Sequence, residues 1–195
     1  QDLVTGSKTL IYYGSLWGSW FDWELIEKVA KSCKDISINL IGDYAGIMEI
    51  VKKMPDNIHF LGLKKQTDLP SYLYYSDYAI LPFKPDEIGK YVSPLKLFEY
   101  IAMNKPVIAT TLEDIVQYEN VYSSNNSKDW INWINNGLDF DIEARNNFIS
   151  NNDWYSRISK MIDSLETSKK CDLEFYDNID FAIEFGNKNL TSDAI

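Results

Sequence analysis

The chain has 195 residues, of which 45% are hydrophobic and 14% aromatic, and this composition is that of a folded globular domain and argues against disorder. The length suits one domain with a hydrophobic core and a short appendage. Basic residues number 19 against 29 acidic ones, and the net charge of −10 argues against nucleic-acid binding, which needs a basic surface to displace counterions.

The scarcity of cysteine and histidine excludes several kinds of site. Cys33 and Cys171 cannot form a disulfide framework, so a reducing cytoplasm is the expected location. We expect no metal site and no histidine-based triad, and we interpret His59 as a strand residue without chemistry. No apolar run reaches the roughly 20 residues of a bilayer crossing, and the first residues lack the pattern of a signal peptide.

Short β-prone runs alternate with helical periodicity over the first two thirds of the chain. The expected strands are 9–13, 37–41, 58–61, 77–82 and 107–110, with a candidate sixth at 121–122. The expected helices are one that begins at Asp22 as its N-cap, then 46–53, 67–74, one from Pro94 to about 103, 128–134, 141–149 and 153–165. This alternation predicts an α/β fold, a Rossmann-like parallel sheet sandwiched by helices.

One domain boundary and two apolar helix faces follow from the same pattern. Residues 1–169 are expected to form the domain and residues 170–195 an acidic C-terminal tail, because helical periodicity ends near Glu166. The helix from Pro94 is expected to turn these residues inward: Leu95, Leu97, Phe98 and Ile101. The last helix carries its apolar residues on one face: Trp154, Ile158, Met161, Ile162 and Leu165.

The segment 93–110 carries the clearest chemistry. Its helix starts at Pro94, at the carboxyl edge of the sheet, where parallel sheets bind their ligands. Unpaired amides from Leu95 onward and the charge of Lys96 would attract phosphate. Glu99, one turn later, could accept two hydroxyl hydrogen bonds such as a ribose presents. An ordinary helix and strand with a solvated Glu99 explains the same residues.

The aromatic residues of the first loop leave two interpretations open. The loop 17–23 could stack against a sugar or a base, whereas packing of Trp20 and Phe21 against the neighbouring domain or the helix below is the favoured interpretation. Trp130 and Trp133 lie on an amphipathic helix and are expected to be core or interface residues.

Pro94-Leu95-Lys96-Leu97-Phe98-Glu99-Tyr100, followed by Lys105-Pro106-Val107-Ile108-Ala109-Thr110, resembles the nucleotide-sugar-binding motif of group 1 GT-B glycosyltransferases. Flanking segments resemble the family in the same order: 13–16, 20–22, 40–42, 57–62, 69–73, 77–82 and 152–157. The resemblance covers roughly residues 9–166. It implies the single C-terminal, donor-binding half of a GT-B fold.

The resemblance implies a set of nucleotide-sugar-binding residues: Gly14, Ser15, Gly62, Leu63, Lys64, Tyr91, Ser93, Pro94, Leu95, Lys96 and Glu99. Glu99 would hold the ribose hydroxyls, and the helix start at 94–96 would hold the pyrophosphate. The loop at 14–15 would approach the phosphates or the sugar, and the backbone of 62–64 would meet the base. The catalytic residues stay unknown, apart from Lys96 as a candidate stabiliser of the leaving group.

Two positions depart from the family pattern. Many relatives have a second glutamate eight positions before the ribose glutamate, and Tyr91 stands there in this chain; Asp86 or Glu87 could substitute for it, or could be solvated loop carboxylates. Relatives often carry Arg and Lys in the first loop, whereas residues 15–19 contain neither. The cations that remain near this edge are Lys84, Lys90 and Lys96, each of which would act as a point charge.

The family resemblance gives a functional expectation. The chain would be the donor-binding domain of a glycosyltransferase, with a UDP-sugar favoured as donor and a glycan or lipid-linked acceptor, as in polysaccharide biosynthesis. It would need an N-terminal acceptor-binding domain or subunit and would be inactive alone. It would use no cofactor and no metal, with the nucleotide-sugar as co-substrate, and it would be cytoplasmic, with peripheral contact at the inner membrane face as a further option.

Two other classes compete with this expectation. The first is a non-catalytic Rossmann-like binding or interaction module that has lost donor binding, which Tyr91 and the uncharged first loop favour. The second is a nicotinamide-dependent oxidoreductase, which the spacing of Gly14 and Gly18 argues against, because no G-x-G-x-x-G follows the first strand.

Overall fold

The structure, a computed structural model, describes residues 2–85, 95–113 and 115–168. The chain divides into two compact units, residues 1–149 and residues 150–195. The expected acidic tail, 170–195, lies outside the described residues, and its boundary stays a prediction. No helix among the described residues is long and apolar enough to cross a membrane.

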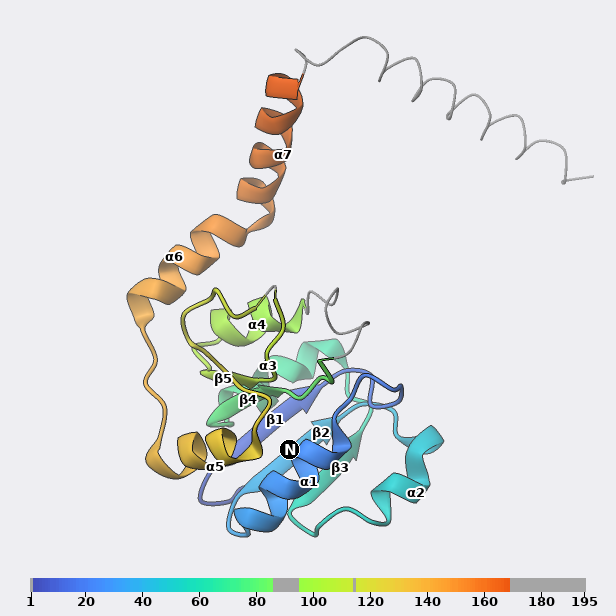
Figure 1. The fold of residues 1–195 in the computed structure, drawn as a ribbon. Helices are drawn as coiled ribbons and strands as arrows, with labels where there is room; N and C mark the ends of the chain where they lie inside the picture. The colour runs from blue at the N-terminus through green and yellow to red at the C-terminus, as the bar shows by residue number, and fades with distance from the viewer. Residues whose placement is uncertain (1, 86–94, 114, 169–195) are drawn as a thin grey trace, which may run out of the picture. The chain divides into compact units, whose positions relative to one another are not determined.

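Within the described residues, one six-stranded sheet organises the first unit (Figure 1). Its strands are β1 (Thr9–Tyr13), β2 (Ser37–Ile41), β3 (Ile58–Gly62), β4 (Tyr78–Leu81), β5 (Val107–Ala109) and β6 (Val121–Ser123). They lie in the order β3-β2-β1-β4-β5-β6, and every neighbouring pair is parallel. The α/β fold and the candidate sixth strand are therefore confirmed.

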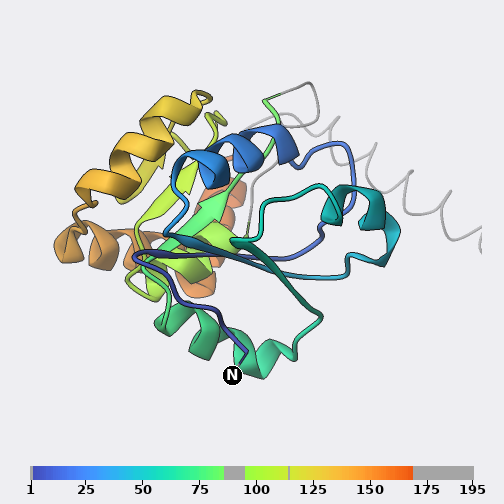
Figure 2. The same cartoon turned by 90° about the horizontal axis from the view of Figure 1, so that it is seen from below.

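Helices cover both faces of this sheet. The helices of the described residues are α1 (Trp23–Ser32), α2 (Met48–Val51) after a 3-10 turn at Ala45–Ile47, α3 (Leu69–Tyr74) after a 3-10 turn at Gln66–Asp68, α4 (Lys96–Ala102), α5 (Ser127–Asn136), and, at the end of the first unit and in the second, α6 (Ile142–Asn152) and α7 (Trp154–Ser168). α1 and α5 lie together on one face, and α3 and α4 lie on the opposite face (Figure 2). Because β1, β2, β4 and β5 are covered on both sides, all of their residues are buried.

Helix α1 forms as its sequence predicts. The Asp22 side chain caps it by accepting a hydrogen bond from the Leu25 amide at 3.0 Å. Its buried residues recur at helical spacing and face the sheet: Leu25, Ile26, Val29 and Ala30. Its outer face carries two exposed ion pairs of the i,i+4 type, Lys28 with Glu24 and Lys31 with Glu27.

The inward face of α4 differs from the expected one. Leu95 is 69% exposed, so its predicted burial is wrong, and Tyr100 is fully buried in its stead. The reason is geometric: the stripe that faces the sheet follows the i, i+3, i+4 pattern of Leu97, Tyr100 and Ile101, and position 95 falls outside it. Phe98 is half-buried and stacks on Phe148, with ring centroids 5.2 Å apart.

The aromatic residues divide between core and surface. Trp130 is fully buried and its indole N–H donates to the Ser124 carbonyl at 2.8 Å, which confirms the core interpretation. Phe21 is also fully buried, and the Trp20 ring lies over Gly18. Trp17 remains 56% exposed. Packing against the protein's own core is thus confirmed for the middle of the first loop.

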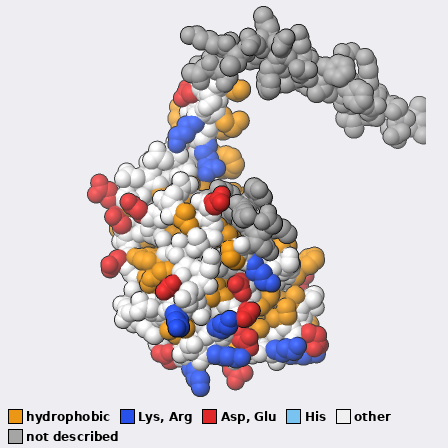
Figure 3. Space-filling view, viewed as in Figure 1, with side chains coloured by type: hydrophobic (Ala, Val, Ile, Leu, Met, Phe, Trp, Pro, Cys, Tyr) orange, Lys and Arg blue, Asp and Glu red, His pale blue; other side chains and the backbone are white. Residues whose placement is uncertain are grey.

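The second unit is described only by the end of α6 and by α7. The apolar side chains that α7 presents are exposed: Trp154, Tyr155, Ile158, Met161, Ile162 and Leu165. Figure 3 shows hydrophobic side chains of this helix at the surface. On the first unit, the same view shows basic side chains interspersed with acidic ones, without a continuous basic surface on that face.

Candidate functional site

The strand order has its switch point between β1 and β4. β1 is followed by β2 on one side of the sheet, whereas β4 is followed by β5 on the other, so the direction in which successive strands are added to the sheet reverses between β1 and β4. The register of this pair covers only Leu10↔Tyr78 and Ile11↔Ala79. Beyond it, the Tyr13 amide donates to the Tyr100 hydroxyl of α4 at 3.3 Å. Open parallel sheets bind their ligands at such a point.

A glycine and a lysine meet at this switch point. Gly14 follows β1 with φ +145°, a conformation that favours glycine. A Cβ on Gly14 would lie 2.9 Å from Lys96 Nζ and still closer to Lys96 Cε, so the lysine side chain lies directly over the glycine. Burial lowers the pKa of Lys96, and the nearby Glu99 carboxylate acts in the opposite direction. The ammonium group is 6.0 Å from the centre of the Tyr12 ring.

Glu99 lies one helical turn after Lys96 and is exposed. Its Oε2 accepts a hydrogen bond from the Tyr13 hydroxyl at 2.6 Å. Burial, followed by the bond to Glu99, raises the pKa of Tyr13, which keeps this hydroxyl protonated as a donor. One turn of α4 therefore presents a cation and a carboxylate that can accept hydrogen bonds from hydroxyl groups, both at the same edge of the sheet.

Close packing of strand ends fixes the first loop. A Cβ on Gly42, at the end of β2, would fall far inside the contact distance of the Gly14 carbonyl oxygen. The Ser15 carbonyl accepts a hydrogen bond from the Tyr12 hydroxyl at 3.0 Å. Gly14 and Ser15 are thus held from both β1 and β2.

A second set of backbone bonds joins the loop after β1 to the segment after β4. The Asp22 amide donates to the Pro82 carbonyl at 2.7 Å, and the Lys84 amide donates to the Trp20 carbonyl at 2.6 Å. We call this pair of linked segments, residues 14–22 and 82–84, the rim.

A hollow of about 410 Å³ lies at the carboxyl ends of β2 and β3. Its lining residues are Gly42, Asp43, Tyr44, Ala45, Met48, Gly62 and Leu63. Gly62 has φ +69°, and the Leu63 side chain is 77% exposed. The hollow is open to solvent, and Asp43 is the charged residue in its lining. It lies next to the carboxyl end of β1, because β1 and β2 are neighbours in the sheet.

The side chain of Lys64 does not join this hollow. Its Nζ lies 2.7 Å from Asp2 Oδ2, and the Tyr72 hydroxyl donates to the other Asp2 oxygen. The hydrogen bond from Lys64, with that from Tyr72, lowers the pKa of Asp2 to about 2. Only the backbone of Lys64 can therefore serve the role that the sequence suggested.

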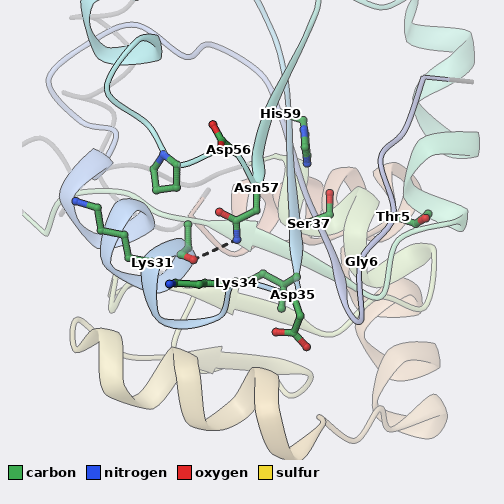
Figure 4. Close-up of a pocket in the computed structure, with 12 residues that line it drawn as sticks. Thr5, Gly6, Lys31, Lys34, Asp35, Ser37, Asp56, Asn57 and His59 are labelled. Atoms are coloured by element: carbon green, nitrogen blue, oxygen red, sulfur yellow. Dashed lines mark hydrogen bonds between the residues drawn. The ribbon is translucent and has the colours of Figure 1, made fainter.

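A larger hollow, about 630 Å³, lies at the opposite, amino edge of β2 and β3 (Figure 4). The ends of α1, β2 and β3 line it, with Lys31, Lys34 and Asp56 among the side chains drawn there. Lys31 is paired with Glu27 at 2.6 Å, and the Asn57 amide group donates to the Ala30 carbonyl at 3.1 Å.

The sequence-predicted site residues fall into three groups. Gly14, Ser15, Lys96 and Glu99 lie together at the switch point, with Leu95 exposed beside Lys96; Gly62 and Leu63 line the neighbouring hollow. A third group lies outside the described residues: Asp86, Glu87, Lys90, Tyr91, Ser93 and Pro94. Sequence reasoning missed the contacts of Tyr13, Tyr100 and Gly42, and of these only Gly42 carried a signal, as a glycine directly after a strand.

The fold and this edge define the class of the protein: a Rossmann-like α/β domain whose candidate site lies where the strand order reverses. A sequence profile of the family described as "Glycosyl transferases group 1" matches residues 7–136. The chain belongs to this family.

Individual relatives agree with that assignment. The chain is 28% identical over 105 residues to a Bacillus subtilis (strain 168) protein provisionally named teichuronic acid biosynthesis glycosyltransferase TuaH, a match that covers 52% of this chain and 26% of the relative. A glycosyltransferase from Rickettsia africae ESF-5 superposes with a TM-score of 0.64 at 19% identity, over 85% of this chain and 48% of that one.

HepE from Anabaena, solved in complex with UDP and glucose, superposes with a TM-score of 0.61 at 17% identity, over 81% of this chain and 48% of that one. At these identities the two superpositions show a shared GT-B glycosyltransferase fold. This chain spans about a quarter of the curated relative and less than half of either solved one.

Proposed function

We propose that this chain is the donor-binding part of a glycosyltransferase, which binds a nucleotide-sugar, with a UDP-sugar favoured, at the carboxyl edge of β1 and α4. The observation that carries the proposal is the placement of Lys96 over Gly14, with Glu99 one turn away on the same helix. Membership of the family and a relative solved with UDP and glucose support the choice of ligand.

Each group has a role in the proposed complex. The missing side chain of Gly14 leaves room for the Lys96 side chain, and the Lys96 ammonium neutralises the diphosphate. Glu99 accepts hydrogen bonds from the ribose hydroxyls. The hollow bounded by Gly62 and Leu63 lies along the same edge of the sheet and is large enough for a pyrimidine ring.

The proposed reaction is transfer of the sugar from the nucleoside diphosphate to a glycan or lipid-linked acceptor. As the bond between sugar and diphosphate breaks, negative charge develops on the departing phosphate oxygen. Lys96 would stabilise that charge from its place over Gly14, where partial burial strengthens the interaction. We propose that a second, acceptor-binding domain or subunit completes the active site, that the nucleotide-sugar serves as co-substrate without a separate cofactor, and that transfer takes place at the cytoplasmic face of the membrane.

Calorimetric titration of the 195-residue chain with UDP, GDP and ADP tests the proposal. We expect UDP to bind, and Glu99→Gln to weaken UDP binding by about 1.5–3 kcal/mol, because hydrogen bonds to a charged acceptor are lost. Glu119→Gln, which removes an exposed carboxylate elsewhere, is the matched control and should leave binding unchanged.

Failure of all three nucleotides to bind at millimolar concentration would overturn the proposal. That result would favour a non-catalytic module that keeps the scaffold, an interpretation that the absence of Lys and Arg from residues 15–19 supports.

A further inference from the structure

The hydroxyl of Tyr13 is aimed at the proposed ribose acceptor. Tyr13 is the last residue of β1 and is 5% exposed, yet its hydroxyl reaches Glu99 Oε2 at 2.6 Å. The two residues are 86 positions apart in the chain, so this hydrogen bond depends on the docking of α4 against the sheet. A buried ring carries the donor, and an exposed carboxylate is the acceptor.

The ring of Tyr13 is itself fixed by α4. It packs edge-on against the Tyr100 ring, with centroids 5.0 Å apart and planes at 85°. The Tyr100 hydroxyl also accepts the Tyr13 amide proton at the point where β1 and β4 separate. Two successive residues of α4, Glu99 and Tyr100, therefore bind the side chain and the backbone of the same β1 residue.

These contacts define the orientation of the carboxylate. A glutamate side chain on an exposed helix surface samples several rotamers, and each one places its oxygens differently. The bond to Tyr13 selects one of them. Because a carboxylate offers about four lone-pair sites, one bond to Tyr13 leaves acceptor capacity for two ribose hydroxyls.

We infer that Tyr13 is a positioning residue for nucleotide binding, which holds Glu99 in the orientation that accepts the vicinal hydroxyls of the donor ribose. This inference rests on the proposed function, since it needs Glu99 to meet the ribose. It assigns a binding role to a β1 residue whose hydroxyl is otherwise a buried polar group beside the sheet. Tyr13 acts through Glu99 and needs no contact with the nucleotide.

The test compares UDP with 2′,3′-dideoxy-UDP, which lacks both ribose hydroxyls. In the wild-type chain we expect UDP to bind more tightly than the dideoxy form. Tyr13→Phe keeps the ring and its packing on Tyr100 but removes the hydroxyl. We expect it to weaken UDP binding about fivefold, an effect of the size with which neighbours in one hydrogen-bond network are coupled. The affinity for 2′,3′-dideoxy-UDP should stay unchanged.

Two further variants separate positioning from a general effect on the fold. Tyr122→Phe also removes a tyrosine hydroxyl, one that donates to the Asp139 carbonyl at 3.0 Å, and should leave both affinities unchanged. In a Glu99→Gln background, Tyr13→Phe should have less than about a twofold further effect on UDP binding, because the partner carboxylate is already absent. Thermal unfolding and circular dichroism of each variant check that the fold is kept.

The outcomes distinguish the inference from the function on which it rests. Unchanged UDP affinity in Tyr13→Phe, with Glu99→Gln still weakening it, overturns the inference and keeps the proposed function. Equal weakening of UDP and 2′,3′-dideoxy-UDP by Tyr13→Phe also overturns it, since the effect would then be structural. Failure of the wild-type chain to bind UDP, GDP and ADP overturns the proposed function and this inference together.

Discussion

The two edges of one sheet carry hollows of different character. The hollow at the amino edge of β2 and β3 is the larger, about 630 Å³ against about 410 Å³ at the carboxyl edge. Yet its lysines are exposed or paired with carboxylates on their own helix, as Lys31 is with Glu27. At the carboxyl edge, Lys96 is partly buried over a glycine and Glu99 is held by a buried tyrosine.

The difference indicates that the volume of a hollow is a weaker guide to a binding site than the contacts that fix its charged side chains. A solvated lysine keeps its rotamer freedom and its hydration, so a ligand must immobilise and desolvate it. A lysine that folding has already partly desolvated interacts more strongly with a phosphate at the same distance. We therefore propose the carboxyl edge as the nucleotide site, although its hollow is the smaller one, because its charged side chains are held by the fold.

The largest expected effect comes from Gly42→Ala, at the carboxyl end of β2. The new Cβ would overlap the Gly14 carbonyl oxygen, which is backbone and cannot rotate away. We expect a loss of about 1–3 kcal/mol of unfolding free energy in urea titrations, together with a loss of UDP affinity. Gly46→Ala, where nothing lies within 4 Å of the new Cβ, is the matched control; a similar loss there would contradict the packing argument.

A lysine at each edge provides the next comparison. Lys96→Gln should lower UDP affinity by about 1–2 kcal/mol, because a charge-assisted contact with the diphosphate is removed. Lys34→Gln, at the amino-edge hollow, should change it less than twofold. Equal losses in calorimetric titrations of the two variants would show that overall charge, and not the placement of Lys96 at the switch point, attracts the nucleotide.

The same lysine predicts a pH dependence. Burial lowers the pKa of Lys96, so its proton is lost at a lower pH than that of a free lysine. Since the diphosphate needs the charged form, UDP affinity should fall as pH rises through that lowered pKa. Affinities measured from neutral pH upward should show this decrease in the wild-type chain and lack it in Lys96→Gln.

The smallest effect concerns a charge close to the carboxyl edge but outside the site. The pKa of Asp2 is about 2 in the folded chain, below its ordinary value of 3.8, because Lys64 and Tyr72 donate hydrogen bonds to it. Its stabilisation is therefore present above about pH 4 and is lost as pH falls through about 2. Asp2 is about half exposed, so Asp2→Asn should cost under about 1 kcal/mol at neutral pH and leave UDP binding unchanged.

Much of the fold was predictable because it depends on local periodicity. The β-prone runs and their glycine exits predict the strands, and apolar residues at helical spacing predict α1 and its cap at Asp22. The exposure of Leu95 was not predicted, since the apolar pattern alone does not fix where α4 begins relative to the sheet. One residue of shift changes which side chains face inward.

The candidate site was predictable in its members and not in its contacts. Lys96 and Glu99 follow from the motif, and their closeness follows from one helical turn. The bond between Tyr13 and Glu99 joins residues 86 positions apart, and the overlap of Gly42 with Gly14 depends on how two strands end side by side. Such long-range distances are set by tertiary packing, which no local pattern encodes.

The segments of the rim are already ordered before a ligand binds. Its two segments are joined by the bonds from Asp22 to Pro82 and from Lys84 to Trp20 before any nucleotide arrives. The conformational entropy of these segments is therefore lost during folding, and a ligand that docks beneath them has less left to immobilise. Such a preorganised border favours tighter binding, because less conformational entropy remains to be lost when a ligand docks.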